Sequence, residues 1–325
     1  MPSGSNRRDT PALADLPPAD RFCDSPSDNP YWNESVWFSV SIPDKRIHGM
    51  IQYYFRPNMN MLNGGPVLWD ASGHNSWDCR HYNWAHLQAL PPGQEKFNMQ
   101  ANNSLAVKVL EPLQRYALSY DHDDLRFELE WNAIGPLHEL KTGDAGQQAT
   151  AKFHIEQPGR MTGTLTSLGE TFSIDCFSMR DTSFGARDYA SLASGGYFWG
   201  IAAESSFHAI AMGKGREQKV IGGYLYRDGE LSSLASGVRR IEEYGRFGPK
   251  KVVFEATDKL GRQLSATGSI DEGLLFTGYT DHTVVWSLVE WDWDGITHWG
   301  DNQEFAPAMR FRQIARGDIE LGTGE

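Results

Sequence analysis

Hydrophobic and polar residues alternate along much of this chain. In Leu125–Trp131 every second residue is apolar and the three between them are charged. Because successive side chains of a strand point to opposite faces, this pattern predicts a half-buried strand. The same period predicts further strands in the first half, at Val36–Ile42, Ile47–Phe55, Leu105–Leu110 and Arg115–Tyr120.

The second half repeats this pattern. Asp228-Gly229 separates two apolar runs, which is typical of a two-residue hairpin, and Asn63-Gly-Gly65 and Asp121–Asp124 are further expected turns. Asp78–Leu90 is the one segment where we expect a short helix. The predicted strands of the second half are Ala151–Gln157, Met161–Leu165, Thr171–Cys176, Gly196–Ala203, Phe207–Met212, Val220–Tyr226, Lys251–Thr257, Arg262–Ser269 and His282–Trp293.

Many short strands separated by turns indicate antiparallel sandwiches or barrels rather than βαβ units. The Gly- and Gln-rich stretch Lys141–Thr150 interrupts the series and suggests a domain boundary. We therefore expect an all-β protein with a disordered leader at 1–20 and two tandem antiparallel β domains, at 21–145 and 150–325. A ligand pocket is expected inside a barrel or between the two domains.

Charge and composition narrow the classes of partner. The 325 residues include 30 Lys and Arg against 42 Asp and Glu, a net charge of −12, which argues against nucleic-acid binding. No apolar run is long enough for a membrane span, the N-terminus has no signal-peptide pattern, and the three cysteines are scattered, so a cytoplasmic protein is expected. An aromatic content of 12% suits a β core or an apolar ligand cavity.

Motifs for phosphate cradles, nucleophile elbows and zinc sites are missing, so we expect neither a metal nor an organic cofactor. Acid–base catalysis by side chains is the class of mechanism that these missing motifs leave open, and two segments contain suitable residues. The strand around His154 places Glu156 on the same face, and a polar turn after Ile174 contains Arg180, Asp181 and Arg187. A histidine beside a carboxylate can form an acid–base pair, and arginines can fix an acid or a substrate oxygen. A solvent-facing strand edge would account equally well for His154 and Glu156. A structural corner would account equally well for Arg180, Asp181 and Arg187.

Aromatic residues accompany a third group of carboxylates. Glu290, Asp292 and Asp294 share one face of a strand whose other face carries tryptophans, which suggests either a glycoside hydrolase or a strand with one wet face. His298 and Asp301 follow in a turn with Trp299 and are expected at a cavity mouth. In the first half, Trp69 and Trp84 are expected either in an aromatic wall or lid over a pocket or in ordinary loop packing.

These residues also carry a family resemblance. His154-Ile-Glu-Gln157-Pro-Gly, Gly163-Thr-Leu and Asp175–Arg187 resemble bacterial proteins related to hydroxyneurosporene synthase, the acyclic carotenoid hydratase, and the AttH-like double-lipocalin group. The family stretch usually reads Arg-Asp-Arg-Ser-Trp-Gly-x-Arg; here Thr182 and Phe184 replace its second Arg and its Trp, which makes this chain a divergent member. Asn33-Glu-Ser35 and Trp299–Gln303 also look similar, so the resemblance spans most of 30–315.

The resemblance implies two lipocalin-like domains around an apolar cavity, with no cofactor. It implies a lyase, hydratase or ether-cleaving enzyme that acts on a small aromatic or terpenoid molecule through a carbocation or quinone methide. We predict Asp181 as the acid or as the group that orients His154, with Arg180 and Arg187 fixing the acid or a substrate oxygen. Tyr189, His298, Trp299, Asp301, Trp69 and Trp84 are predicted to contact substrate. A non-catalytic carrier of an apolar ligand is the alternative, and homo- or hetero-oligomers are possible for either.

Overall fold

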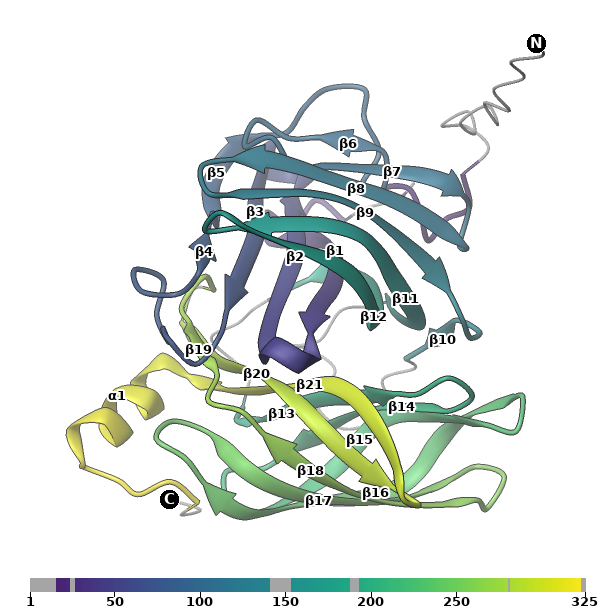
Figure 1. Ribbon diagram of the computed structural model, residues 1–325, viewed down its shortest axis with the longest axis vertical. Coiled ribbons are helices and arrows are strands. Elements are labelled where there is room, and N and C mark those ends of the chain that lie inside the picture. The colour runs from purple at the N-terminus through teal and green to yellow at the C-terminus, as the bar shows by residue number, and fades with distance from the viewer. Residues whose placement is uncertain (1–15, 24–26, 141–152, 188–192, 280, 323–325) are drawn as a thin grey trace.

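Two antiparallel β-sheets lie one above the other in the computed structural model (Figure 1), which describes residues 16–23, 27–140, 153–187, 193–279 and 281–322. Strands form most of the described chain, so the prediction of an all-β protein with two tandem antiparallel domains is confirmed.

The first sheet contains twelve of the described strands and curls around its own core. Its order is β4-β3-β2-β1-β12-β11-β9-β8-β7-β6, with β5 paired to β3 and β10 to β11. The strands are β1 (Trp32–Ile42), β2 (Ile47–Arg56), β3 (Met61–Trp69), β4 (His81–Tyr82), β5 (Ala85–Ala89), β6 (Met99–Gln100), β7 (Ala106–Glu111), β8 (Arg115–His122), β9 (Leu125–Ala133), β10 (His138–Glu139), β11 (Phe153–Ser167) and β12 (Glu170–Ala186).

The second sheet closes on itself, because β18 pairs with both β17 and β20. This closure gives an eight-stranded antiparallel barrel, to which β19 is attached through β20. Its strands are β13 (Gly195–Ile201), β14 (Ser206–Met212), β15 (Glu217–Arg227), β16 (Glu230–Tyr244), β17 (Pro249–Asp258), β18 (Gln263–Ile270), β19 (Leu274–Phe276), β20 (His282–Trp293) and β21 (Ile296–Pro307).

Each sheet has its own apolar core, and a third core joins the sheets. Val36 and Phe38 of β1 point into the first sheet, whereas Trp37 between them points out toward the second. In the second barrel, Phe198 points inward and its neighbours Tyr197 and Trp199 point toward the first sheet. Both facing surfaces are therefore apolar, and their contact removes large aromatic side chains from water.

The chain changes sheets later than the composition suggested. β11 pairs with β9, and β12 pairs with β1, so both belong to the first sheet and the change falls between Ala186 and Gly195. The expected boundary at 146–149 lies outside the described residues. A Gly-rich stretch indicates a connection, but it does not indicate which sheet the next strands join.

The expected leader at 1–20 is ordered at its end, whereas residues 1–15 lie outside the described part. Leu16 packs in the first core, and Asp20 is fully buried. Asp20 accepts hydrogen bonds from Arg180 and Tyr116, at 2.7 and 2.6 Å. These charge-assisted bonds explain why a Pro-rich segment without periodicity is held in place.

Two local expectations were wrong. Asp78–Leu90 forms β4 and β5 rather than a helix, because the open edge of β3 takes these residues as partners. Asn63-Gly-Gly65 runs inside β3 instead of turning. A Cβ on Gly64 would lie 2.2 Å from the carbonyl oxygen of Gln52, and its φ is +132°, so glycine is needed there for close strand contact.

Other turns occur where expected, at Asp228-Gly229 between β15 and β16 and at Asp123-Asp124 between β8 and β9. Three-residue 3-10 helices, η2 (Pro43–Lys45) and η3 (Pro57–Met59), connect β1 to β2 and β2 to β3. The helix α1 (Ala308–Arg316) follows β21. No helix in the described ranges has the length and apolar character that a membrane crossing would need.

Candidate active site

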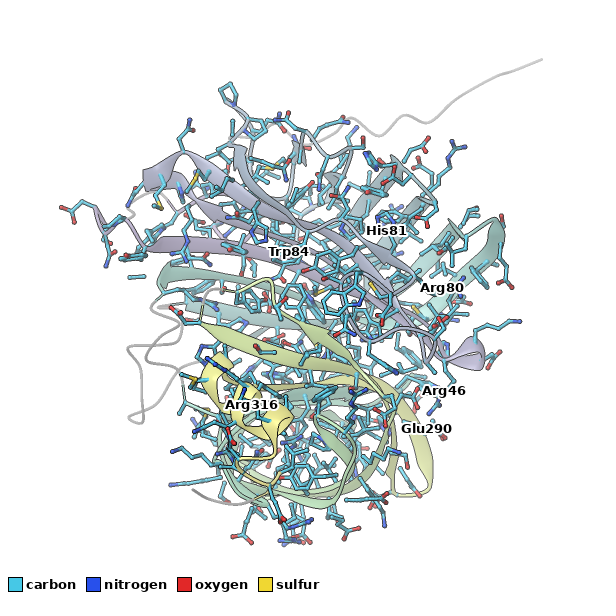
Figure 2. The ribbon with its side chains drawn as sticks, turned by 90° about the vertical axis from the view of Figure 1, so that its left-hand side faces the viewer. Arg46, Arg80, His81, Trp84, Glu290 and Arg316 are labelled. Carbon is cyan, nitrogen blue, oxygen red and sulfur yellow. The ribbon has the colours of Figure 1, made fainter. Side chains whose placement is uncertain are left out.

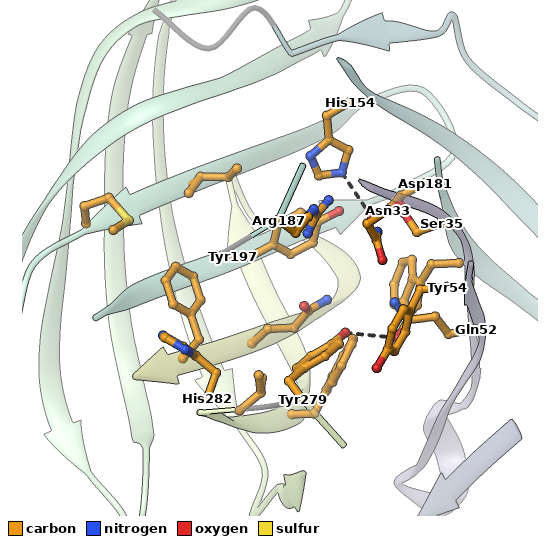
Figure 3. A pocket seen from close by; sticks show the side chains of 17 residues that line it. Asn33, Ser35, Gln52, Tyr54, His154, Asp181, Arg187, Tyr197, Tyr279 and His282 are labelled. Atoms are coloured by element: carbon orange, nitrogen blue, oxygen red, sulfur yellow. Dashed lines mark hydrogen bonds and ion pairs between the residues drawn. The ribbon is translucent and has the colours of Figure 1, made fainter. Parts of the chain in front are cut away.

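A pocket of about 140 Å³ lies between the two sheets. The outer faces of β1, β2, β11 and β12 form one side, and β13, β14, β20 and β21 form the other, together with Tyr279 (Figure 3). Cavities of about 150 Å³ accept a benzene ring, so this space suits one small ring. Most of its wall is apolar, and its aromatic members are Trp37, Tyr54, Tyr197, Tyr279, Trp286 and Phe305.

Strand register brings the polar groups of the pocket together. Glu156 lies opposite Asp181, and His154 lies opposite Ser183, on the paired strands β11 and β12. On the other side of β12, Asp181 lies opposite Trp37 of β1. Since these residues alternate with core residues along each strand, all of them face the second barrel.

His154 is held between two carboxylates. Its Nε2 lies 3.2 Å from Oδ2 of Asp181 and 3.0 Å from Oε1 of Glu156. The contact with Asp181 is a hydrogen bond, drawn in Figure 3. A single Nε2–H can point fully at only one acceptor, so Oε1 of Glu156 has an ion-pair contact but no hydrogen bond.

The second barrel completes this cluster. The hydroxyl of Tyr197 on β13 donates to Oε2 of Glu156 at 2.6 Å, and its ring lies parallel to that of His154. His208 of β14 is fully buried, with its Nε2 3.8 Å from Glu156. Burial lowers the pKa of His208 well below the usual value, and His154 lowers it further, so His208 is neutral.

The cluster keeps a proton at neutral pH. Burial lowers the pKa of His154, but the charges of Asp181 and Glu156 and the hydrogen bond to Asp181 outweigh burial and raise it to about 9. Burial raises the pKa of Glu156 to about 7, although His154 opposes the rise. Near pH 7 His154 is charged, and the cluster can gain or lose one further proton.

A cation could also bind here. His154, Glu156 and Asp181 each offer one ligand atom, and the three atoms lie within 4.8 Å of one another. Imidazole and carboxylate are common ligands of divalent metals, but the ion would have to displace the proton of His154. The expectation that no metal is used stays a prediction.

Three predicted site residues meet in the pocket, namely His154, Asp181 and Arg187. The register of β12 excludes Arg180, which points to the opposite face and is fully buried in the first core. There it pairs with Asp20 and lies over the rings of Phe97 and Tyr116, at 4.5 Å from each. It cannot fix the acid from that side. Tyr189 lies outside the described residues.

The other predicted contacts are elsewhere. His298 contacts Ser205 at 2.7 Å, in a separate depression of the second barrel, and Trp299 packs under Arg46. Asp301 is buried behind the pocket, where it accepts a hydrogen bond from Trp286 at 2.9 Å. Trp69 and Trp84 belong to the core between the sheets but are not part of the pocket wall.

The carboxylates at the end of β20 and in the turn after it do not form a paired acid site. Glu290 pairs with Arg46 at 3.1 Å at the seam between the sheets (Figure 2). Asp292 accepts a hydrogen bond from the backbone of Gly295, and Asp294 contacts Arg227. Trp291 and Trp293 are buried in the second barrel, so β20 has one wet face at this end, and the glycosidase interpretation has no support.

Several residues of the site were not predicted as site residues. Glu156 had a visible signal, since it shares a strand face with His154, and it is a partner of that histidine rather than part of the pocket wall. Asn33 lies in a segment that looked family-like. Tyr197, Tyr279 and Trp286 had no such signal, because only the packing of the second barrel brings them to β11 and β12.

Comparisons with known proteins agree with this architecture. The model of one family, described as "Domain of unknown function (DUF7064)", matches residues 17–305. Among curated proteins, no match is found. A putative AttH from Nitrosomonas europaea is similar in structure, with a TM-score of 0.51, 11% identity, and coverage of 85% of this chain and 91% of the other.

The crystal structure of CghA with Sch210972 is also similar, with a TM-score of 0.55 and 11% identity, covering 91% of this chain and 96% of CghA. At these identities the likeness concerns the fold alone. It agrees with the fold that the resemblance implies, whereas the relationships to AttH-like proteins and to hydroxyneurosporene synthase stay predictions.

Proposed function

This chain belongs to the family described as a domain of unknown function, DUF7064, and from its pocket we propose a cofactor-independent lyase, hydratase or ether-cleaving enzyme. Its substrate is a small, largely apolar aromatic or terpenoid molecule. The observation that carries the proposal is His154 between Glu156 and Asp181, at the wall of an aromatic pocket. The CghA structure, which contains Sch210972, supports a ligand-holding role for this fold.

The chemistry proposed is general acid catalysis. Asp181 and His154 both line the pocket, and the proton shared in their cluster is transferred to an alkene carbon or an ether oxygen of the substrate. For an ether, the C–O bond then breaks with its electron pair on oxygen, and an alcohol leaves. The faces of Trp37 and Tyr54 stabilise the positive charge that develops.

The cation is resolved in one of two ways. It loses a proton to the carboxylate of Asp181, which gives an alkene, or it captures water, whose extra proton returns to the same carboxylate. Glu156 is fully buried and does not line the pocket, so it acts through His154: it holds the imidazole, and its own proton sets the protonation state of the cluster.

Turnover of candidate compounds, followed by mass spectrometry, tests this proposal. Asp181→Asn and His154→Ala should each lower kcat by about 10²–10⁴-fold, the usual contribution of a general acid. Asp175→Asn is the matched control, since Asp175 is an exposed carboxylate on the same strand and pairs with Arg160. Full activity of both site variants on a true substrate would refute the assignment.

A non-catalytic carrier is the second candidate, and the predominantly apolar wall favours it. A carrier would quench the fluorescence of Trp37 and Trp286 on binding and would return its ligand with unchanged mass. The enzyme would bind and convert it, so the mass after incubation separates the two functions.

A further inference from the structure

The pocket contains a buried amide without a partner. Asn33 of β1 is 1% exposed, and neither its Nδ2 nor its Oδ1 has a hydrogen bond to any described residue. In the register of β1 and β12 it lies opposite Gly185, which has no side chain to fill the space. An unpaired amide of this kind is costly to bury, so a ligand atom that pairs with it would recover free energy.

Arg187 stands next to this amide on the same face of the sheet, since its backbone pairs with Tyr31 two residues before Asn33. One guanidinium nitrogen donates to Ser183 at 2.6 Å, and its buried Nε has no hydrogen-bond partner. Within the described ranges no carboxylate lies within ion-pair distance of it. Arginine keeps its charge at any physiological pH, so this pocket holds a cation that no described anion balances.

Both side chains turn toward the pocket interior (Figure 3). We propose that Arg187 and Asn33 bind a carboxylate of the substrate, so that the substrate class is a small aromatic or terpenoid carboxylic acid. The Nε–H of Arg187 and the amide N–H of Asn33 donate to the carboxylate oxygens. The apolar body then lies between Trp37, Tyr54 and Trp286, next to His154 and Asp181.

Charge balance favours a monoanion over a phosphate. Arg187 is the one arginine among the described residues that line the pocket, and Asp181 lies in the same wall. One carboxylate matches the single charge of Arg187. A phosphate dianion would bring more negative charge than the single arginine of the pocket balances, and it would lie close to Asp181.

This inference rests on the proposed function but is tested without turnover. The probes are benzoate and trans-cinnamate, each paired with its neutral amide, and binding is measured by quenching of Trp fluorescence and by calorimetry. At least one carboxylate should bind about 10–100-fold tighter than its amide, the range expected for a charge-assisted hydrogen bond.

Variants assign this preference to the two residues. Arg187→Met should abolish the preference for carboxylate, and Asn33→Asp, which keeps the shape of the side chain, should reverse it. Arg160→Met is the matched control because Arg160 is exposed on β11 and pairs with Asp175, and it should change nothing. Melting curves of each variant identify loss of folding.

Equal binding of acids and amides, unchanged preference in Arg187→Met, or no carboxylate bound at millimolar concentration would each overturn the inference. None of these binding results bears on the proposed general acid catalysis, because His154 and Asp181 are unchanged in the wild type and in these variants. Loss of turnover in the Asp181 and His154 variants is a separate measurement and decides the proposed function by itself.

Discussion

His154 shows how single residues acquire chemistry from their surroundings. A buried imidazole would ordinarily be neutral, but Asp181 and Glu156 hold it in its charged form. Glu156 in turn has no hydrogen bond on Oε1 and has a raised pKa, so a proton is readily accommodated there. Two carboxylates and one imidazole thus form a group that exchanges a proton near neutral pH.

The pH dependence of turnover follows from these values. If the cluster acts as an acid, its protonated form is active, and Glu156 loses its proton as pH rises through about 7. We expect kcat to be constant below pH 7 and to fall above it by about tenfold per unit, as for a required acid. A pH profile of kcat for wild type and for Glu156→Gln measures this.

The Gln variant cannot ionise, so its profile should have no step near pH 7. Its remaining step should be that of His154, whose pKa is about 9 in the wild type. A rate that rises with pH through 7 would mean that the deprotonated cluster is active, and the general-acid assignment would be withdrawn.

At the scale of elements, β12 separates structure from chemistry. Asp181 faces the pocket, whereas its neighbours Arg180 and Thr182 are fully buried on the other face. Arg180 is paired with Asp20 and packed between rings in the first core. The Arg180-Asp181 dipeptide therefore places a stabilising cation on one face of β12 and a candidate acid on the other, so the two side chains do not contact each other.

Replacement of Arg180 should affect stability and leave the chemistry in place. Arg180→Ala should lower the free energy of unfolding by about 3–5 kcal/mol, because it leaves Asp20 buried without its partner. Denaturant titration measures the loss, and kcat of the folded fraction at low temperature should match that of the wild type. A fall in kcat with unchanged stability would instead indicate that Arg180 belongs to the active site.

The whole molecule depends on the core between the sheets. Trp37 of β1 stacks on Trp286 of β20 at 6.0 Å, and Tyr279 donates to Gln52 across the same interface. Arg46 adds a contact to Asp271 at 2.6 Å. Since each sheet would expose large aromatic side chains without the other, we expect the two sheets to unfold together.

Calorimetry tests this cooperativity. One transition is expected, with equal calorimetric and van't Hoff enthalpies, and Trp286→Ala should destabilise the whole chain by about 3–5 kcal/mol. Trp77→Ala is the matched control, because Trp77 is 81% exposed, and its effect should stay within about 0.5 kcal/mol. Two separate transitions would contradict a shared core.

The sequence by itself determined many of the strands, most of the expected turns and which side chains share a face, whereas β3, β16 and β21 were not predicted. His154 and Glu156 were predictable as neighbours because alternation is a property of the local backbone. The pairing of β11 with β12 and the placement of both in the first sheet were not predictable, since a repeating alternation fits many partners. Only the tertiary structure decided that this face meets Tyr197 and Trp286, because contacts between residues far apart in the chain depend on how two complete sheets pack.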